Sequence, residues 1–383
     1  MTIAWNPSRG PTLGVEWEVL LVDPKTRLLR QDADAVLAGL DGLTDSGEHP
    51  KLKHELMQST VEVVTGICGT AAEAKADLSI ALKELQRAAE PHGIALAGAG
   101  THPVSGWRDA RLVPSQRYTE LVEQLQWPVR RMQVCAAQIH VGLRDGDRAM
   151  SIINALATRM PHFLGLTASS PYWNGDDTGL ASMRSLVFGA LPNTGPPPPI
   201  RDWRGFEAYM DTQLRAGSIR SIKEVWWDIR PHPDYGTVEI RMCDAVSTLR
   251  EIGMVAALAQ CLVRFFDSQL DRGYRLPCHD PWIVGENKWR ATRYGLDATV
   301  ITDNHGSTAP LRDEVYELLR DLEPVASRLG CAEELAVADE VLVAGAPYER
   351  QRAVRDASGD LSSVVDALVT EFAEDRFVTP ALA

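Results

Sequence analysis

Several segments of this chain that are typical of β-strands place acidic side chains on one face and apolar side chains on the other. The run "TLGVEWEVLLVD" (12–23) is the clearest example. In an extended strand Glu16 and Glu18 point to one face, while Trp17 points to the opposite face. Glutamate is a poor strand former and is rarely buried unless it is paired or bound to a cation. A single Glu-x-Glu pattern is also typical of a strand with one solvated face. This strand alone therefore does not decide between a solvated face and a face whose acids are paired or bound to a cation.

Four further strand-like segments repeat the pattern. They contribute Glu62 in "VEVVTG", Gln138 and His140 in "VCAAQIHVGL", Asp228 and Arg230 in "VWWDIRP", and Glu239 and Arg241 in "GTVEIRMCD". Each has a simpler interpretation, such as a buried core histidine for His140 or an ion pair at a strand edge for Asp228 and Arg230. Together they are hard to explain as solvated faces, because solvated faces carry Lys, Thr and Ser rather than acids, imidazole and arginine. The five segments therefore predict a sheet with one functional face.

The order of the predicted elements indicates the fold class. Helices are predicted after the capping boxes Thr70–Glu73 and Thr248–Glu251, and over most of the chain beyond residue 309. Strands are predicted at 12–22, 61–65, 94–97, 134–143, 225–230 and 237–242, the last two joined by the turn "PHPDYG". Regular alternation of one strand with one helix is absent from this order. We therefore predict an α+β fold in which a largely antiparallel sheet is backed by helices.

The composition of the chain limits the expected cellular location and the expected binding partners. The formal net charge of −13 and a pI of about 5.2 argue against a nucleic-acid or membrane-surface partner. The start "MTIAWNPSRG" does not resemble a signal peptide, and the longest apolar stretch (252–266) is short for a transmembrane span. We expect a cytoplasmic protein with reduced cysteines and one catalytic domain over residues 1–383. Its motifs lie between about residues 12 and 300, and a helical segment follows at 301–383. Whether the protein forms a homo-oligomer is left open by the sequence.

The acids of the functional face indicate a metal. Glu16, Glu18, Glu62 and Glu239, crowded on one sheet face, would repel one another unless cations lay between them. Carboxylate ligands without a thiolate pattern favour a hard cation, Mg²⁺ or Mn²⁺, over zinc. Arginines among the acids indicate an anionic group, and phosphoryl transfer uses both metal and arginine. The sequence has neither a P-loop nor a G-x-G-x-x-G motif, so the nucleotide would be held in another way.

A series of motifs from residue 12 to about 298 resembles one family. The series comprises "GVEWEVLLVD", "HELMQSTVEVVTGIC", "GTHP", "QIHVGL", "SPYWNGDDTGLASMR", "WWDIRP", "GTVEIRMCDA" and "ENKWRATRYGLDA". In this order it is similar to the carboxylate–amine ligases related to glutamate–cysteine ligase type 2. The resemblance implies a glutamine-synthetase-like catalytic fold, in which an antiparallel sheet forms a funnel that holds Mg²⁺ and ATP.

Transferred position by position, the resemblance also implies roles for individual residues. Arg241 would contact phosphate or the transferred group, with Arg184 and Arg230 as further catalytic arginines. Two positions depart from the family pattern: Trp17 stands where an acid is frequent but faces away from the site, and Met183 stands where an aromatic residue is frequent. The implied metal ligands are Glu16, Glu18, Glu55, Glu62, His140 and Glu239.

Two of the motifs allow more than one interpretation. The segment "SPYWNGDDTGLASMRS" (170–185), called the middle motif below, is interpreted as a turn that caps a helix through Asp177 or Thr178. It is also interpreted as a substrate loop that directs Arg184 at a carboxylate or phosphate. In "GENKWRATRYG" the side chains of Asn287, Arg290 and Arg293 lie broadly on one side of a helix. These three either bind the nucleotide or substrate, or form an exposed basic face.

The function implied by the resemblance is ATP-dependent amide formation through an acyl phosphate. The carboxylate substrate would be glutamate, and the amine would be cysteine or another acceptor. Two alternatives stay open: a guanidino or carboxylate kinase on the same fold, and a regulatory protein that binds nucleotide and metal without turnover.

Overall fold

A computed structural model describes residues 1–8, 10–44 and 47–379. Its centre is a seven-stranded sheet in the order β10-β11-β5-β1-β3-β2, with β4 paired to the end of β1, and every pairing in it is antiparallel. The strands are β1 (Leu13–Val22), β2 (Leu52–His54), β3 (Thr60–Val64), β4 (Ala95–Ala97), β5 (Ala136–Gly142), β10 (Ile229–His232) and β11 (Thr237–Asp244). The predicted α+β class with an antiparallel sheet is confirmed.

The register of these strands gathers the polar residues on one face. Glu18 lies opposite Glu62 on β3, and Glu16 lies opposite Gln138 on β5. Further along, Glu239 on β11 lies between His140 and Arg230, the residues opposite it on the two neighbouring strands. Because side chains alternate between faces, these residues project from the same side of the sheet.

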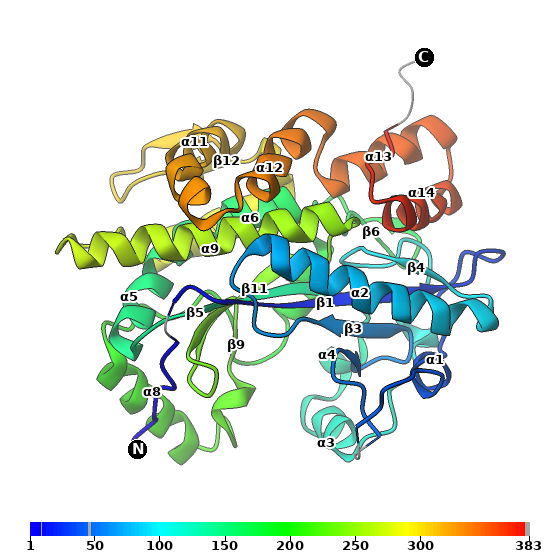
Figure 1. The fold of residues 1–383 in the computed structure, drawn as a ribbon, viewed down its shortest axis with the longest axis horizontal. Coiled ribbons are helices and arrows are strands. Elements are labelled where there is room, and N and C mark those ends of the chain that lie inside the picture. The colour runs from blue at the N-terminus through cyan, green and yellow to red at the C-terminus, as the bar shows by residue number, and fades with distance from the viewer. Residues whose placement is uncertain (9, 45–46, 380–383) are drawn as a thin grey trace.

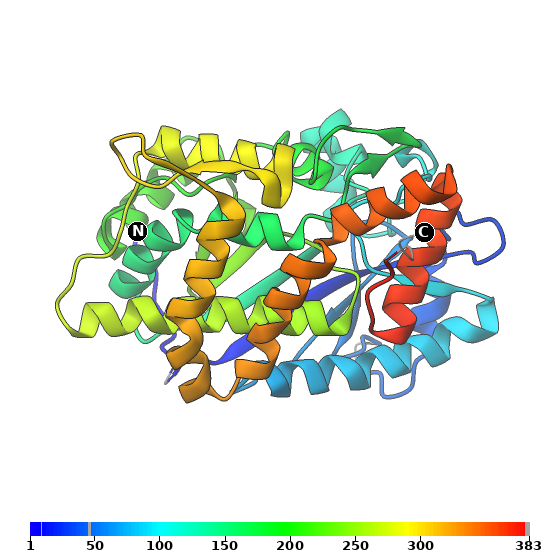
Figure 2. The ribbon, with the colours of Figure 1, turned by 90° about the horizontal axis from the view of Figure 1, so that it is seen from above.

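Helices cover the other face. The helices α2 (Ala71–Ala89) and α9 (Leu249–Asp271) lie along the sheet, and α11 (Leu311–Leu329) and α12 (Ala332–Ala344) cross over α9 (Figures 1 and 2). Thr70 caps α2, and Thr248 with Glu251 forms the predicted capping box of α9. Trp17 is fully buried on this side, with its ring centroid 5.2 Å from that of Phe372 in α14 (Leu361–Glu374). The predicted orientation of Trp17, away from the polar face, is confirmed.

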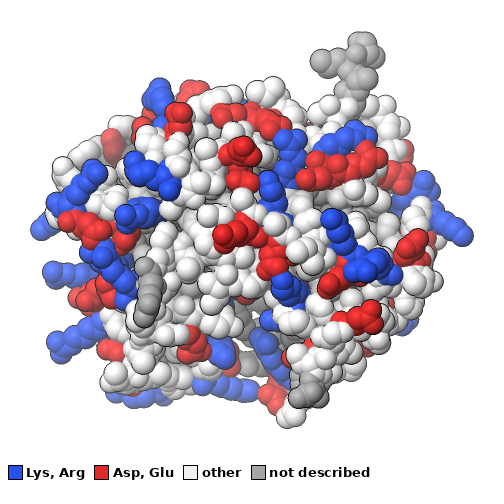
Figure 3. Space-filling model, viewed as in Figure 1, with Lys and Arg blue, Asp and Glu red and all other residues white. Residues whose placement is uncertain are grey.

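Two lobes flank the polar face (Figure 1). One lobe contains α1 (Ala33–Ala38), α3 (Gln116–Leu125) and α4 (Trp127–Arg130); the other contains α5 (Gly146–Ala157), α8 (Trp203–Arg215) and the parallel pair β8 (Thr194–Gly195) and β9 (Trp226–Trp227). In the space-filling view the surface is hollowed between the lobes, and positive and negative side chains are mixed over this side (Figure 3). The polar face therefore lies at the floor of a recess between two lobes.

The remaining elements connect these layers. They are α6 (Met160–Thr167), α7 (Met183–Phe188), α10 (Pro281–Tyr294), α13 (Pro347–Ser358), the hairpins β6–β7 (Tyr172–Trp173, Asp176–Asp177) and β12–β13 (Thr299–Ile301, Thr308–Pro310), and four short 3₁₀ turns, η1 (Glu90–His92), η2 (Trp107–Asp109), η3 (Ile222–Glu224) and η4 (Gly295–Asp297).

The strand predicted at 225–230 is divided in two, because the chain leaves β9 at Asp228 before it enters β10. Buried apolar side chains from Ile3 to Phe372 form one core cluster. The predicted division of the chain into a motif-bearing part up to about residue 300 and a helical segment at 301–383 stays a prediction. All six cysteines are free thiols, and five of them are buried. Within the described ranges, no helix combines the length and hydropathy needed to cross a membrane.

Candidate active site

Three glutamates form an acidic cluster at one end of the polar face. Burial raises the pKa of Glu18 to about 8, and the negative charge of Glu55 adds to the shift. Burial and the charge of Glu55 also raise the pKa of Glu62 well above its ordinary value, and burial raises that of Glu55. One carboxylate oxygen of Glu18 accepts a hydrogen bond from the backbone N–H of Ala136 at 2.7 Å, and the other lies 3.4 Å from Gln138 Nε2. These contacts do not offset the mutual repulsion of the cluster.

Glu16 and His140 link this cluster to the centre of the sheet. The Nε2 atom of His140 lies 3.3 Å from Glu16 Oε1, and its Nδ1 atom lies 2.9 Å from the hydroxyl oxygen of Thr237. Burial alone would raise the pKa of Glu16, but the neighbouring imidazole outweighs burial and lowers it. His140 is buried, and Nε2 makes no well-aligned hydrogen bond among the described residues. The imidazole is therefore held through Nδ1, with Nε2 directed at the Glu16 carboxylate.

Arginines surround Glu239 at the other end of the face. Arg230 donates to its two carboxylate oxygens at 2.7 and 3.2 Å, and Arg241 donates to the same carboxylate and to Gln138. Burial would raise the pKa of Glu239, but the charges of Arg241 and Arg230 hold it well below its usual range. The strand pattern predicts that Glu239 is one of the acids that repel one another. In this structure its charge is instead neutralised by two guanidinium groups.

Arg184, on α7, reaches the same sheet from the side. Its side chain is buried and donates to the backbone carbonyl oxygens of Arg241 at 3.0 Å and Met242 at 3.2 Å. The structure thus brings Arg184 beside Arg241, but its described hydrogen bonds are to the backbone of β11. Its predicted role towards a substrate carboxylate or phosphate stays a prediction.

Asp244, a buried carboxylate that sequence analysis did not single out, holds the segment before Arg184. One oxygen accepts hydrogen bonds from the Ser169 backbone N–H at 3.0 Å and the Ser170 hydroxyl at 2.6 Å, and the other accepts from the Ser182 hydroxyl at 2.8 Å. The available signal was an acid directly after the apolar end of "GTVEIRMC". Asp244 therefore ties the loop of the middle motif to the end of β11.

The predicted cap of the helix in the middle motif is wrong. Ser182 caps α7 by accepting a hydrogen bond from the backbone N–H of Ser185, whereas Thr178 donates its hydroxyl to the Pro171 carbonyl oxygen. Asp177 forms an ion pair with Arg352 instead. The helix begins only at Met183, so Asp177 and Thr178 lie too far upstream to cap it.

The three residues predicted on one side of α10 have partners outside the acidic cluster. The side-chain amide of Asn287 forms two hydrogen bonds with the backbone of Ile301, at 2.7 and 2.8 Å. Arg290 pairs with a glutamate one turn earlier on the same helix, and Arg293 donates to the carbonyl oxygen of Gly179 in the middle motif. Their role in nucleotide binding stays a prediction.

A neighbouring lysine on the same helix was missed. Lys288 Nζ contacts both carboxylate oxygens of Asp228, at 2.6 and 2.8 Å, and the carboxylate is buried. The spacing in "VWWDIRP" favours Arg230 as the partner of Asp228 instead. The break between β9 and β10 turns Asp228 towards α10, which explains the different pairing.

The donor set fits a hard divalent cation in its chemistry. It offers carboxylate oxygens and one imidazole nitrogen, and it lacks thiolates. Among the residues that the structure describes, no three His, Cys, Asp or Glu side chains surround a single point closely enough to hold an ion. Burial and the charges of neighbouring glutamates raise the pKa values of Glu18, Glu55 and Glu62, and a divalent cation would relieve the repulsion among them.

Comparison with known proteins identifies the family. The model of "Glutamate-cysteine ligase family 2" matches residues 12–367. The chain belongs to this family. A relative from Thermobifida fusca named "Putative glutamate--cysteine ligase 2" is 60% identical, over 97% of this chain and 93% of its own length. A relative from Frankia casuarinae named "Putative glutamate--cysteine ligase 2-1" is 51% identical, over 98% and 99%.

The fold has a counterpart among solved structures. The crystal structure of a glutamate–cysteine ligase from Francisella tularensis in complex with AMP superposes with a TM-score of 0.70, over 98% of this chain and 91% of that one, at 12% identity. At this identity the likeness shows the fold alone. Membership of glutamate–cysteine ligase family 2 confirms the resemblance found in the sequence and the predicted enzyme class, a ligase that forms a C–N bond.

Proposed function

We propose that this member of glutamate–cysteine ligase family 2 joins the side-chain carboxylate of glutamate to an amine, cysteine or another acceptor, with ATP and Mg²⁺ (or Mn²⁺). The observation that carries the proposal is the division of one sheet face into an acidic cluster around Glu18 and a pair of arginines around Glu239. Such a face can hold cations and an anionic phosphoryl group next to each other.

The reaction has two steps. A carboxylate oxygen of the first substrate attacks the terminal phosphorus of ATP, the bond from that phosphorus to the bridging oxygen breaks, and ADP leaves. The amine nitrogen then attacks the acyl carbon of the acyl phosphate, loses a proton, and displaces inorganic phosphate. Neither step needs a covalent bond to the protein.

The residues of the polar face have separate roles in this proposal. The cations would be held by Glu16, Glu18, Glu55, Glu62, His140 and the Glu239 oxygen that Arg241 releases. When bound, they would neutralise phosphate charge. Arg230 and Arg241 bind the phosphoryl group during transfer, because guanidinium groups contact phosphate oxygens at two points. To do so, Arg241 exchanges part of its contact with Glu239 for the phosphoryl group.

Product analysis tests the proposal. ADP and inorganic phosphate are measured with Mg²⁺ and ATP, with glutamate alone, and with glutamate plus each member of a panel of amines. We expect equal amounts of ADP, phosphate and amide. These products should form at a substantial rate only when an accepted amine is present. ADP with a stable phosphorylated product would indicate a kinase instead, and nucleotide binding without ADP formation would indicate a regulatory protein.

A further inference from the structure

The turn between β10 and β11 presents a pair of stacked rings next to the candidate active site. The rings of His232 and Tyr235 lie face to face, with centroids 4.1 Å apart and planes 7° apart. The ring of His140 meets both edge-on, at 5.5 and 5.7 Å. Although it is held in this stack, Tyr235 remains 62% exposed. The Tyr235 ring therefore has one face packed against His232, and its other face is open to a ligand.

The stack lies on the polar face of the sheet. Arg230 and His232 alternate along β10 with the buried residues Ile229 and Pro231, so the side chains of Arg230 and His232 project from the same face. His232 lies opposite Thr237, whose hydroxyl oxygen contacts His140. The two rings thus continue the row of site residues outward to the rim of the recess.

The N-terminal segment holds this turn in place. The backbone N–H and the side-chain amide of Asn6 donate to the carbonyl oxygens of Pro233 and Asp234, both at 3.0 Å. Gly236 has a φ of +63°, and a Cβ there would lie 1.6 Å from the carbonyl oxygen of Asn6. Only glycine allows this close approach. The turn that carries Tyr235 is therefore fixed before any ligand binds.

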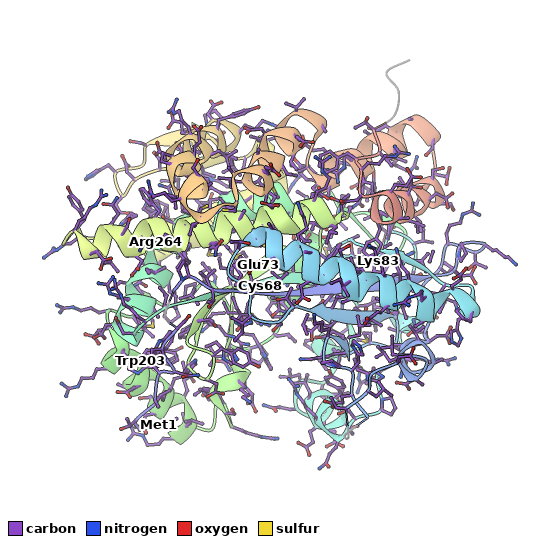
Figure 4. The ribbon with its side chains drawn as sticks, in the orientation of Figure 1. Met1, Cys68, Glu73, Lys83, Trp203 and Arg264 are labelled. Atoms are coloured by element: carbon purple, nitrogen blue, oxygen red, sulfur yellow. The ribbon has the colours of Figure 1, made fainter. Side chains whose placement is uncertain are left out.

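The N-terminal segment is also anchored on the lobe that contains α5 and α8. The indole N–H of Trp5 donates to the Leu143 carbonyl oxygen at 3.1 Å, and that of Trp203 donates to the Ile3 carbonyl oxygen at 3.0 Å. The two indole rings meet edge-on at 5.2 Å. Figure 4 shows Met1 and Trp203 together in this lobe. An exposed tyrosine with this much support is preorganised for contact with a flat partner.

We propose that the open face of the Tyr235 ring, backed by His232, binds the purine base of the nucleotide by stacking. The assignment rests on the proposed use of ATP. A flat π-surface at the rim, in the row that leads to His140 and Glu239, allows the base to stack outside while the phosphates reach the arginines and cations within. Stacking of bases on aromatic side chains does not require hydrogen-bond partners for the base. This accounts for a platform built of rings alone.

Direct binding measurements with two probes test the assignment. The dissociation constants of ADP and of inorganic tripolyphosphate, which lacks a base, are measured in Mg²⁺ for the unaltered chain, Tyr235→Ala and Tyr235→Phe. Tyr274→Ala serves as a matched control, because Tyr274 is 61% exposed and follows α9, away from the polar face. Melting temperatures show whether each variant is folded.

We expect Tyr235→Ala to weaken ADP binding roughly ten-fold or more, with little change for tripolyphosphate. Tyr235→Phe keeps the ring and should bind ADP like the unaltered chain, as should Tyr274→Ala. Unchanged ADP binding by a folded Tyr235→Ala protein, or an equal loss for both probes, would overturn the assignment and leave the proposed ligase intact. Failure of the unaltered chain to bind ADP would overturn both.

Discussion

Arg352 and Asp177 form a two-point ion pair that joins the C-terminal helices to the middle motif. Arg352 Nη1 and Nη2 lie 2.9 Å from the two carboxylate oxygens of Asp177, and Nη2 also donates to the Leu180 carbonyl oxygen at 3.2 Å. Nearby on α13, the Gln351 side chain donates to the Ser169 carbonyl oxygen at 2.8 Å, and the Tyr348 N–H donates to that of Ala168 at 2.9 Å. The C-terminal helices thus fasten the loop that leads to Arg184.

Charge reversal of this pair should change substrate use more than stability. Both side chains are partly exposed, so the loss of the pair should cost the folded state no more than about 1 kcal/mol. Arg352→Asp places two acids together and should displace the loop, which raises the KM of the carboxylate substrate several-fold. Arg352→Asp combined with Asp177→Arg should restore KM. If the single variant kept a normal KM, or the double variant showed no recovery, the pair would have no role in positioning.

Truncation of Trp17 should destabilise the protein without disabling the site. The indole is fully buried and packs against Phe372, so Trp17→Ala should cost about 3–5 kcal/mol in unfolding free energy. Trp17→Phe keeps a ring in the same space and should cost less. Denaturant unfolding measures both, and turnover per folded molecule should be nearly unchanged. A stable Trp17→Ala protein that no longer binds ATP would contradict the assignment of the two sheet faces.

Glu18→Gln should stabilise the metal-free protein at alkaline pH. The pKa of Glu18 rises from its ordinary value of 4.5 to about 8, so the folded state retains a proton that the unfolded state releases. The contribution of this group is complete below pH 4.5 and is lost as pH rises through about 8. The variant escapes this loss, so its melting temperature with a chelator should exceed that of the unaltered chain at pH 8, and the difference should vanish below pH 4.5. An equal melting temperature at pH 8 would indicate a solvated glutamate.

Glu239→Gln should have the opposite effect on stability. The carboxylate is buried between Arg230 and Arg241, and its removal leaves two guanidinium groups without their shared counter-charge. Breaking a buried pair in this way typically costs about 3–5 kcal/mol. Thermal or denaturant unfolding at pH 7 should show this loss. Turnover should fall by orders of magnitude for Glu239→Gln and also for Glu18→Gln. A Glu239→Gln protein as stable as the unaltered chain would indicate that the arginines have other partners in solution.

Removal of divalent cations should abolish turnover and leave the fold intact. The core consists of apolar side chains from the whole chain, so the fold does not require bound metal. Activity and circular dichroism are measured after chelation and again after Mg²⁺ or Mn²⁺ is added back. Unchanged turnover after chelation would contradict the role assigned to the acidic cluster.

Much of the fold could be predicted from local patterns. The period of two in "GVEWEVLLV" places Glu18 and Trp17 on opposite faces, and Thr248 with Glu251 marks the start of α9, as the structure confirms. Contacts between distant segments could not be predicted in this way. Arg352 and Asp177 are 175 residues apart, and nothing local in either segment indicates its partner. The pairing of Glu239 with Arg230 depends on the register across the hairpin turn, which the strand pattern alone does not fix.

Isotope transfer tests the central claim most directly. Glutamate labelled with ¹⁸O in its side-chain carboxylate is supplied with Mg²⁺, ATP and an accepted amine, and the phosphate-containing products are analysed by mass spectrometry. An acyl phosphate places one carboxylate oxygen between carbon and phosphorus, and this oxygen leaves with phosphorus when the amine attacks. We therefore predict one ¹⁸O atom in each inorganic phosphate released. Label in AMP, or amide formation without label in any phosphate, would contradict the proposed mechanism.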